Sequence, residues 1–278
     1  MVDLIQQVAE KIRQADKIVI GASNGLSISE GIHIFANNHD FRTKFSDFEQ
    51  KYGFHSLIQG CFYPFQDSQV YWAYFARLHD YMTRQKPAGI VMQNLFALVK
   101  KKDFFVVTSN FENHFRQAGF PEERLFEIEG NGIDFQCKTQ CTDQVYNGEK
   151  QLQEMAECEN GYVPEHLVPY CPNCGGEMQI HIELDSNFQQ DKIWRTKRDA
   201  YQAFLQDGAD KNVLFLELGV GARNQLIKMP FMQWVYQHPK AFYITVNKGE
   251  LYIPKEIASR SLGVDGGLNE VLEALNEA

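Results

Sequence analysis

Short apolar runs recur along the chain and alternate with segments of helical periodicity. Five runs rich in β-branched and aromatic residues occupy residues 17–23, 103–110, 124–130, 212–221 and 241–247. Most are nearly continuous apolar stretches, a pattern typical of parallel strands that are buried on both faces. Helical segments lie between them, for example 90–101 and 229–238. The alternation predicts an α/β fold built on a doubly wound, Rossmann-like parallel sheet.

Two stretches interrupt this alternation. Residues 31–88 are rich in aromatic side chains, and their apolar positions recur at helical spacing, which most simply indicates helices packed on the sheet. Residues 135–177 contain five of the six cysteines and have little periodicity. We therefore predict a large domain made of residues 1–30, 89–134 and 178–278, with a smaller inserted domain that consists of a helical module and a zinc-ribbon module.

The amino-terminal segment predicts an amphipathic helix followed by a strand, and it lacks the apolar core of a signal peptide. No segment approaches the roughly 20 apolar residues that a membrane span requires. The net charge of −9 argues against a nucleic-acid partner, because binding to phosphates requires a basic surface. We therefore expect a cytoplasmic protein that binds neither membranes nor nucleic acids.

In a cytoplasmic chain, six cysteines favour metal ligands or reactive thiols over disulfides. Two short pairs, about thirty residues apart, consist of Cys137, Cys141, Cys171 and Cys174. Four thiolates satisfy tetrahedral Zn²⁺ and leave no coordination position open for chemistry. We predict a structural zinc site at these cysteines. The alternatives are a set of unpaired thiols, or a site in which Cys158 or His166 replaces one of the four ligands.

The segment GASNGLS (21–27) follows the first predicted strand and precedes a predicted helix. Such a turn can bring backbone N–H groups to an anionic phosphate, or it can simply be a tight bend, and it matches neither G-x-G-x-x-G nor the P-loop. Polar or glycine-rich residues also end other predicted strands, at 108–110, 129–132, 219–222 and 246–250. Because ligands of doubly wound sheets bind beyond the carboxyl ends of the strands, these segments predict a dinucleotide site.

The order of these motifs resembles that of the sirtuins, which carry a Gly-Ala-Gly turn, a Thr-Gln-Asn strand end, a His-Gly strand end, a four-cysteine zinc ribbon and later Gly-rich turns. Here the segments are GASNGLS, TSNFE, EG, the four cysteines, ELGVGAR and VNKGE, in the same order over nearly the whole chain. FSDFEQKYGF, GCFYPF, YWAYFAR and LFLELGVG look more narrowly like the class M, macrodomain-linked sirtuins. Known members of that branch transfer ADP-ribose to protein and show little deacetylase activity. They are often encoded beside lipoyl-carrier proteins.

The resemblance implies an NAD site at the carboxyl edge of the sheet. The implied cofactor-binding residues are Gly21, Ala22, Ser23, Gly25, Ser27, Ser109, Asn110, Glu112, Gly219, Val220, Gly221, Asn247, Lys248 and Asp265. The first five would line the phosphates, and Ser109 and Asn110 would face the nicotinamide ribose. Glu112 would hold the carboxamide, and the later residues would lie on the phosphate and adenosine side.

Three departures from the sirtuin pattern affect the expected chemistry. The turn at 21–27 is two residues longer than that of the family, and the Asp-Phe-Arg that follows it in sirtuins has no secure counterpart. The position of the catalytic histidine holds Glu129. A carboxylate there can act as a weak general base or stabilise a cationic sugar, and the alternative is a structural residue that caps the following turn. Asn110 would position the ribose or a water molecule. His114 is a candidate substitute base, but it is more simply an ordinary histidine at a helix start.

These observations favour an NAD-dependent protein mono-ADP-ribosyltransferase of the class M sirtuin type. Asn110 and Glu129 are the predicted catalytic residues. The predicted acceptor is a partner protein, and a lipoyl carrier is the candidate that the resemblance suggests. One alternative is an NAD-dependent protein lysine deacylase, against which the absent histidine counts. A second alternative is a catalytically weak NAD sensor or partner-binding module. The longer turn at 21–27 and the acidic residues Glu112 and Glu129 favour this alternative.

Overall fold

The structure is a computed structural model and describes residues 2–158 and 161–278; residues 159 and 160 of the predicted zinc module lie outside the described part. The strands of the main sheet are β1 (Lys17–Ala22), β2 (Asp103–Thr108), β3 (Leu125–Glu127), β7 (Val213–Leu218), β8 (Phe242–Val246) and β9 (Ser261–Val264). All six are parallel, in the order β3-β2-β1-β7-β8-β9. The predicted doubly wound parallel sheet is therefore confirmed.

β1 lies at the centre of this sheet, between β2 and β7. Its Ile18 pairs with Phe104 on one side and with Leu214 on the other, and all of its residues are buried. From β1 the chain adds β2 and β3 on one side, and it later adds β7, β8 and β9 on the other. The strand order thus reverses between β1 and β7, which is where a doubly wound sheet forms a ligand crevice.

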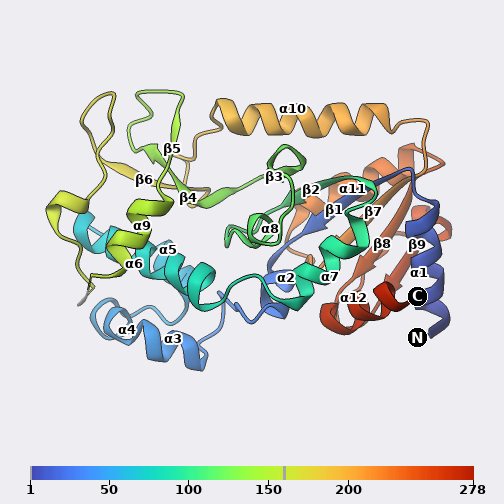
Figure 1. Cartoon of the computed structure of the whole chain (residues 1–278), viewed down its shortest axis with the longest axis horizontal. Coiled ribbons are helices and arrows are strands. Elements are labelled where there is room, and N and C mark those ends of the chain that lie inside the picture. Colours follow the sequence, from blue (N-terminus) through green and yellow to red (C-terminus); the bar gives the residue numbers. More distant parts are fainter. Residues whose placement is uncertain (1, 159–160) are drawn as a thin grey trace.

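Helices cover both faces of the main sheet (Figure 1). On one face lie α1 (Val2–Gln14), α7 (Ile90–Val99) and α12 (Leu268–Glu277), and on the other lie α10 (Lys192–Asp207) and α11 (Gln225–Gln237). The first group buries apolar side chains such as Ile12 and Leu95 in one core. The second group buries Phe204 and Phe231 in a separate core. The sheet is therefore covered by apolar layers on both sides, as its continuous apolar strands require.

α11 begins four residues earlier than the segment 229–238 that the sequence predicts, since it starts at Gln225. Pro230 lies inside the helix. A proline is favoured in the first turn of a helix because it has no N–H to donate, so the pattern alone places the helix start beside Pro230. The earlier start is stabilised by burial of Ile227 and Phe231 against the sheet.

A second, smaller unit combines the helical and the cysteine-rich segments. Its helices are α3 (His39–Lys44), α4 (Ser46–Tyr52), α5 (Leu57–Cys61), α6 (Ser68–Asp80) and α9 (Glu149–Ala156), with a π-helical turn at Tyr81–Gln85. Its antiparallel sheet has the order β5 (Val145–Asn147), β4 (Gly130–Cys137), β6 (Met178–Ile182). Both segments share one hydrophobic core, in which the rings of Trp72 and Phe135 lie 4.5 Å apart between centroids. The helical and zinc modules therefore pack as one unit.

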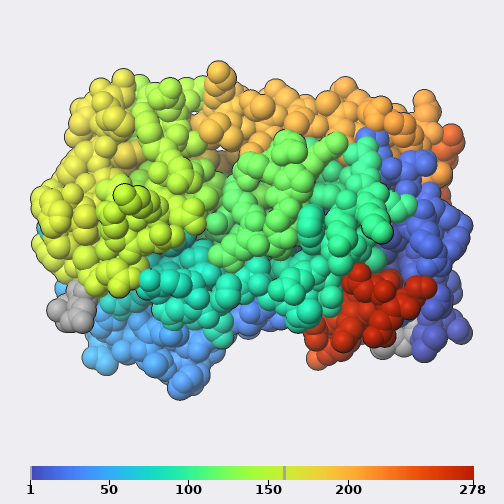
Figure 2. Space-filling view, in the orientation of Figure 1, coloured from blue at the N-terminus to red at the C-terminus, as the bar shows by residue number. Residues whose placement is uncertain are grey.

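Short elements complete the chain: α2 (Asn24–Ser29), α8 (His114–Gln117) and 3₁₀ turns at Glu122–Arg124, Glu165–Leu167 and Lys255–Arg260. The amino- and carboxyl-terminal segments both belong to the large unit, at the end of the molecule away from the cysteine-rich segment (Figures 1 and 2). Within the part of the chain that the structure describes, no helix has both the length and the apolar character that a bilayer span needs.

Candidate active site and zinc centre

A cleft of about 850 Å³ lies beyond the carboxyl ends of β1, β2, β7 and β8. The large unit lines it with Ser23, Asn24, Gly25, Ser109, Gly219, Gly221, Arg223, Asn224, Asn247 and Glu250. The opposite wall and the segments that cross between the units contribute Phe62, Phe111, Glu129, Ile182, Glu183 and Leu184. The cleft therefore opens at the point where the strand order reverses, and the small unit forms one of its walls.

Two glycines bring the ends of β1 and β7 into contact at the floor of the cleft. The Gly25 N–H donates to the carbonyl of Gly219 at 2.9 Å. A Cβ atom at either glycine would lie 2.5 Å from a backbone atom of the other. Gly219 also has φ of +61°, a left-handed conformation that disfavours other residues. The glycine-rich turn is thus required by the close approach of two strand ends, and the same approach exposes backbone to the cleft.

Three polar side chains meet at this floor. The Asn224 amide donates to the hydroxyl of Ser109 at 2.8 Å and to that of Ser23 at 3.0 Å, and the two hydroxyls lie 3.1 Å apart. The Oδ1 atom of Asn224 is buried and accepts no hydrogen bond from the described residues. Ser23 and Ser109 are positions that the sequence predicts, whereas Asn224 is not. No hydrophobic pattern or glycine spacing marks Asn224 in the sequence.

Asn110 is held immediately behind these serines. Its amide donates to the carbonyl of Ser23 at 3.2 Å, and its backbone N–H donates to the Thr108 hydroxyl at 3.0 Å. The side chain is 4% exposed, and its Oδ1 atom lacks a donor anywhere in residues 2–158 and 161–278. Asn110 therefore offers a fixed acceptor oxygen that no described residue satisfies, which is unusual for a buried polar atom.

Glu129 lies between β3 and β4, is half-buried and lines the cleft. Burial raises the pKa of its carboxyl to about 7, and the nearby charge of Glu183 contributes to the rise. The other charged side chains of the cleft wall are Arg223 and Glu250. Glu129 therefore faces the cleft rather than the core, and it is about half ionised near neutral pH.

Glu112 and His114 lie deeper than the cleft wall. Burial raises the pKa of Glu112, while the charge of His114 and a hydrogen bond to Ser27 oppose that rise. The Nε2 atom of His114 lies 2.8 Å from the Lys86 carbonyl and 3.0 Å from the Met82 carbonyl, and it donates to them. His114 is thus a buried structural residue that links α8 to the π-helical turn.

Four other predicted cofactor positions are not among the described residues that line the cleft. Gly21 and Ala22 are buried within β1, and Ser27 and Val220 are also buried. A Cβ atom at Gly21 would lie 2.4 Å from the side chain of Phe231. This glycine therefore allows α11 to pack against the centre of the sheet.

The late predicted segment forms a loop at the cleft mouth. Asn247 lines the cleft and donates through Nδ2 to the main-chain carbonyl of Glu250 at 3.0 Å. The carboxylate of Asp265 accepts from the Gly249 N–H at 2.8 Å. Asp265 and Lys248 are both exposed. Asn247 and Asp265 therefore fix the shape of this loop, one from inside the cleft and one from outside it.

The rim of the cleft carries exposed apolar side chains that the sequence analysis does not single out. Ile28 is 41% exposed, Phe35 53%, Phe62 57% and Leu226 57%, and all four line the cleft. Phe62 and Leu226 lie far from Ile28 and Phe35 in the chain, so no local pattern marks the four as neighbours. Large apolar groups exposed around a cavity are typical of sites that bind a partner or an apolar ligand.

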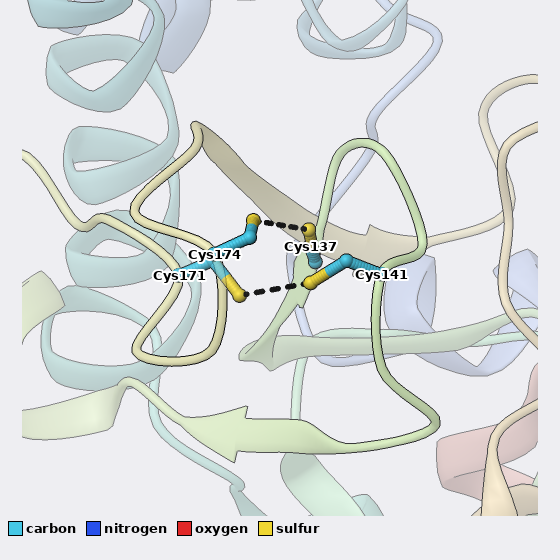
Figure 3. Close-up of side chains that lie close together, drawn as sticks. All are labelled: Cys137, Cys141, Cys171 and Cys174. Carbon is cyan, nitrogen blue, oxygen red and sulfur yellow. Dashed lines mark hydrogen bonds between the residues drawn. The ribbon is translucent and has the colours of Figure 1, made fainter.

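The four predicted zinc ligands come together (Figure 3). The sulfur atoms of Cys137, Cys141, Cys171 and Cys174 all lie within 4.8 Å of one another. Cys141 and Cys171 are 3.5 Å apart, and Cys137 and Cys174 are 3.7 Å apart. A tetrahedral site with Zn–S bonds of about 2.3 Å places its sulfur atoms about 3.8 Å apart. The set fits a structural Zn²⁺, and within the described residues Cys158 and His166 lie outside it.

Fold and cleft together define an α/β protein with a dinucleotide-type crevice and a four-cysteine metal centre. No family model matches the chain. It is 30% identical over 254 residues to a protein ADP-ribosyltransferase of Staphylococcus aureus, which covers 90% of this chain and 80% of the relative. It is 26% identical over 217 residues to NAD-dependent protein deacylase 2 of Pseudomonas aeruginosa, covering 73% of this chain and 75% of that protein.

Solved structures agree with the sequence relatives. A mutant Sir2 homologue in complex with ADP-ribose superposes with a TM-score of 0.64, at 15% identity, over 98% of this chain and 95% of that one. Sir2Tm bound to a propionylated peptide superposes with a TM-score of 0.59 over 98% of this chain and 97% of that chain. The chain belongs to the sirtuin superfamily.

Proposed function

We propose that this chain is an NAD-dependent protein mono-ADP-ribosyltransferase of the class M sirtuin type. The observation that carries the proposal is the half-buried carboxyl group of Glu129 in the cleft wall, where the sirtuin resemblance places a catalytic histidine. The relative from Staphylococcus aureus, a protein ADP-ribosyltransferase, supports the same activity. Free cysteines arranged as a zinc site also support a reducing, cytoplasmic location.

The residues present in the cleft fit a dinucleotide. Asn224 lines the cleft and Asn110 lies directly behind the lining serines. Each has a buried acceptor oxygen that no described residue satisfies, and ribose hydroxyls would supply the missing donors. Arg223 is the basic side chain among the described residues that line the cleft, and its guanidinium suits a pyrophosphate. Gly25 and Gly219 leave room for close approach to the backbone. We therefore assign Ser109 and Asn110 to the ribose beside nicotinamide, and Ser23 and Gly25 to the phosphates.

Bound NAD would supply an electron-poor ribose carbon once its nicotinamide–ribose bond breaks. Glu129 lines the cleft and is about half ionised near neutral pH, so its carboxylate can stabilise positive charge on that carbon and accept a proton from an incoming nucleophile. The amide of Asn110 has no basic nitrogen at neutral pH. Asn110 therefore orients the ribose or a water molecule and does not remove a proton. These roles suit transfer of ADP-ribose better than release of an acyl group.

In this proposal the acceptor of ADP-ribose is a protein, and the candidate acceptor is a lipoyl-carrier protein. Support comes from the rim of the cleft, where Phe35, Phe62 and Leu226 expose large apolar surface beside Glu129 and Glu183. A modified lysine arm with an aliphatic stem would be buried there at a gain of about 25 cal/mol per Å² of apolar surface. The rim should therefore bind an apolar arm more tightly than a charged side chain.

A deacylase is the second candidate function, because NAD-dependent protein deacylase 2 of Pseudomonas aeruginosa is a relative. The chemistry of the site counts against it. A carboxylate with pKa about 7 can accept a proton, but the described cleft wall provides no histidine for the step that releases the acyl group. Release of O-acyl-ADP-ribose from an acylated peptide would favour this function instead.

The test uses purified protein, NAD labelled in its adenosine half, and a lipoyl carrier in its lipoylated and unmodified forms. We expect label on the carrier protein, and we expect Asn110→Ala and Glu129→Ala to remove it. Glu273→Ala, an exposed change on α12, serves as the matched control and should label normally. Binding of NAD without any label transfer or nicotinamide release would contradict the transferase and support the sensor alternative.

A further inference from the structure

Glu183 stands beside Glu129 where the chain crosses between the two units. It directly follows β6, and its backbone N–H donates to the carbonyl of Glu129 at 2.8 Å. The next pair along these strands, Gly130 and Ile182, is in register in the small sheet. Because both side chains also line the same cleft, the backbone contact fixes two carboxyl groups as neighbours in one wall.

The charge of Glu183 has no partner among the residues that the structure describes. Its side chain is exposed, and it forms no ion pair or side-chain hydrogen bond within residues 2–158 and 161–278. Arg223 and Glu250 are the other charged groups of the cleft wall, and both come from the large unit. Glu127 precedes Glu129 by two residues, but its carboxylate accepts a hydrogen bond from the Arg116 guanidinium at 2.6 Å, which compensates its charge. Glu183 is therefore the carboxylate whose charge acts on Glu129.

We propose that Glu183 is a positioning residue for the transfer reaction: its negative charge moves to higher pH the range over which Glu129 is able to accept a proton from the acceptor. The inference rests on the proposed function, and it adds a second carboxylate to the machinery. Glu183 touches no reacting atom in this assignment and acts through Glu129.

The sign of the effect follows from Coulomb repulsion between like charges. A neighbouring negative charge disfavours ionisation of Glu129, and together with burial, the larger cause, it raises the pKa of that carboxyl to about 7. Glu183→Gln removes the charge and keeps the shape and the backbone contact. The pKa of Glu129 should then fall, but it should stay above its ordinary value because burial still raises it. A base with lower pKa ionises at lower pH but accepts a proton less strongly.

The experiment measures kcat/KM for ADP-ribosyl transfer against pH for the unaltered protein, Glu183→Gln and Glu250→Gln. In the unaltered protein we expect activity to rise with pH through about 7. Glu183→Gln should move this rise to lower pH and reduce the plateau. Glu250→Gln changes a carboxylate of the same cleft that makes no such contact with Glu129, and it should leave the position of the rise unchanged. Equal profiles for all three proteins would overturn the proposal, and so would equal shifts in both variants.

A second readout separates this inference from the proposed function. The carboxyl carbon of Glu129 can be titrated by NMR in protein labelled at glutamate, with Glu129→Gln to identify its signal. A lower midpoint in Glu183→Gln than in the unaltered protein supports the role of Glu183 even if no acceptor is labelled. An unchanged midpoint overturns it, whether or not the protein transfers ADP-ribose.

Discussion

Two glycines at the cleft floor have no room for a side chain. A Cβ atom at Gly25 would lie 2.5 Å from the backbone of Gly219, and neither strand end can move without disturbing the sheet. We expect Gly25→Ala to lower the free energy of unfolding by about 1–3 kcal/mol. We also expect it to weaken NAD binding by about tenfold, or 1.4 kcal/mol, because the floor of the cleft shifts. Urea unfolding and calorimetric titration with NAD measure the two effects.

Gly53→Ala is the matched control for this prediction. Gly53 ends α4 with φ of +75°, and no atom of the described residues lies within 4 Å of an added Cβ. The substitution should cost about 1 kcal/mol through backbone conformation alone and leave NAD binding unchanged. If Gly25→Ala bound NAD as tightly as Gly53→Ala, the contact between the strand ends would have no part in the site.

Asn224 joins two serines that come from different strands. Its amide donates to both Ser23 and Ser109, so Asn224→Ala removes both donors and opens a gap in the floor. A hydrogen bond contributes about 0.5–1.5 kcal/mol, so we expect NAD affinity to fall by about tenfold. Calorimetry checks this, with Asn212→Ala, an exposed change at the far end of β7, as the control. Equal affinities in the two variants would exclude a role for Asn224.

The sequence predicts those site residues that end a strand, because position in the fold follows from chain order. Ser23, Ser109 and Glu129 all belong to this class, and all line the cleft. Asn224 and Phe35 could not be found in this way. Each reaches the cleft from a loop whose path depends on packing between distant segments, so neither position has a local signal in hydrophobic pattern or glycine spacing.

At the scale of elements, a buried ion pair fixes α11 to the sheet. Lys228 of α11 donates to Glu217 of β7, and the Thr245 hydroxyl donates to the same carboxylate at 2.9 Å. Glu217 is 0% exposed and Lys228 3%. Lys228→Met leaves a buried charge without its partner, so we expect a loss of about 3–5 kcal/mol in the free energy of unfolding. Urea denaturation measures the loss.

Two further variants test whether the unpaired charge is the cause. Lys240→Met removes an exposed lysine that contacts the main-chain carbonyl of Asp210, and it should change stability little. Glu217→Gln combined with Lys228→Met removes the stranded charge, so it should recover part of the loss. A double variant no more stable than Lys228→Met alone would point to lost packing instead of electrostatics.

Strands within continuous apolar runs were predictable, including the three-residue β3 within the run 124–130, while β9 was not. The strands β1, β2, β7 and β8 lie within the runs that the sequence marks, because burial on both faces forces an unbroken apolar pattern. β9 is only Ser261–Val264 and contains a glycine, so it gives no such pattern. It exists because the edge of β8 supplies hydrogen-bond partners, which is a tertiary effect.

The four-cysteine centre and the cleft wall that carries Glu129 belong to the same small unit. Cys137 ends β4 and Gly130 begins it, so a single strand runs from the zinc ligands to the residue after Glu129. Cys137 and Cys171 are also buried in the core that holds Trp72 and Phe135. The distant zinc site therefore supports one side of the cleft through a strand and through a shared core.

Removal of zinc should consequently affect the two units unequally. With a chelator, the four cysteines lose the ion that ties the end of β4 to Cys171 and Cys174, so the end of β4 opens and the small core loosens. We expect amide hydrogens of β4 and β6 to lose protection against exchange while those of β1 and β7 keep it, because the main sheet has separate apolar cores. NAD binding should weaken as the wall that carries Glu129 is lost. Cys158→Ser, which changes a cysteine outside the cluster, should keep both zinc and protection. Loss of protection in both sheets at the same chelator concentration would show that the units unfold together.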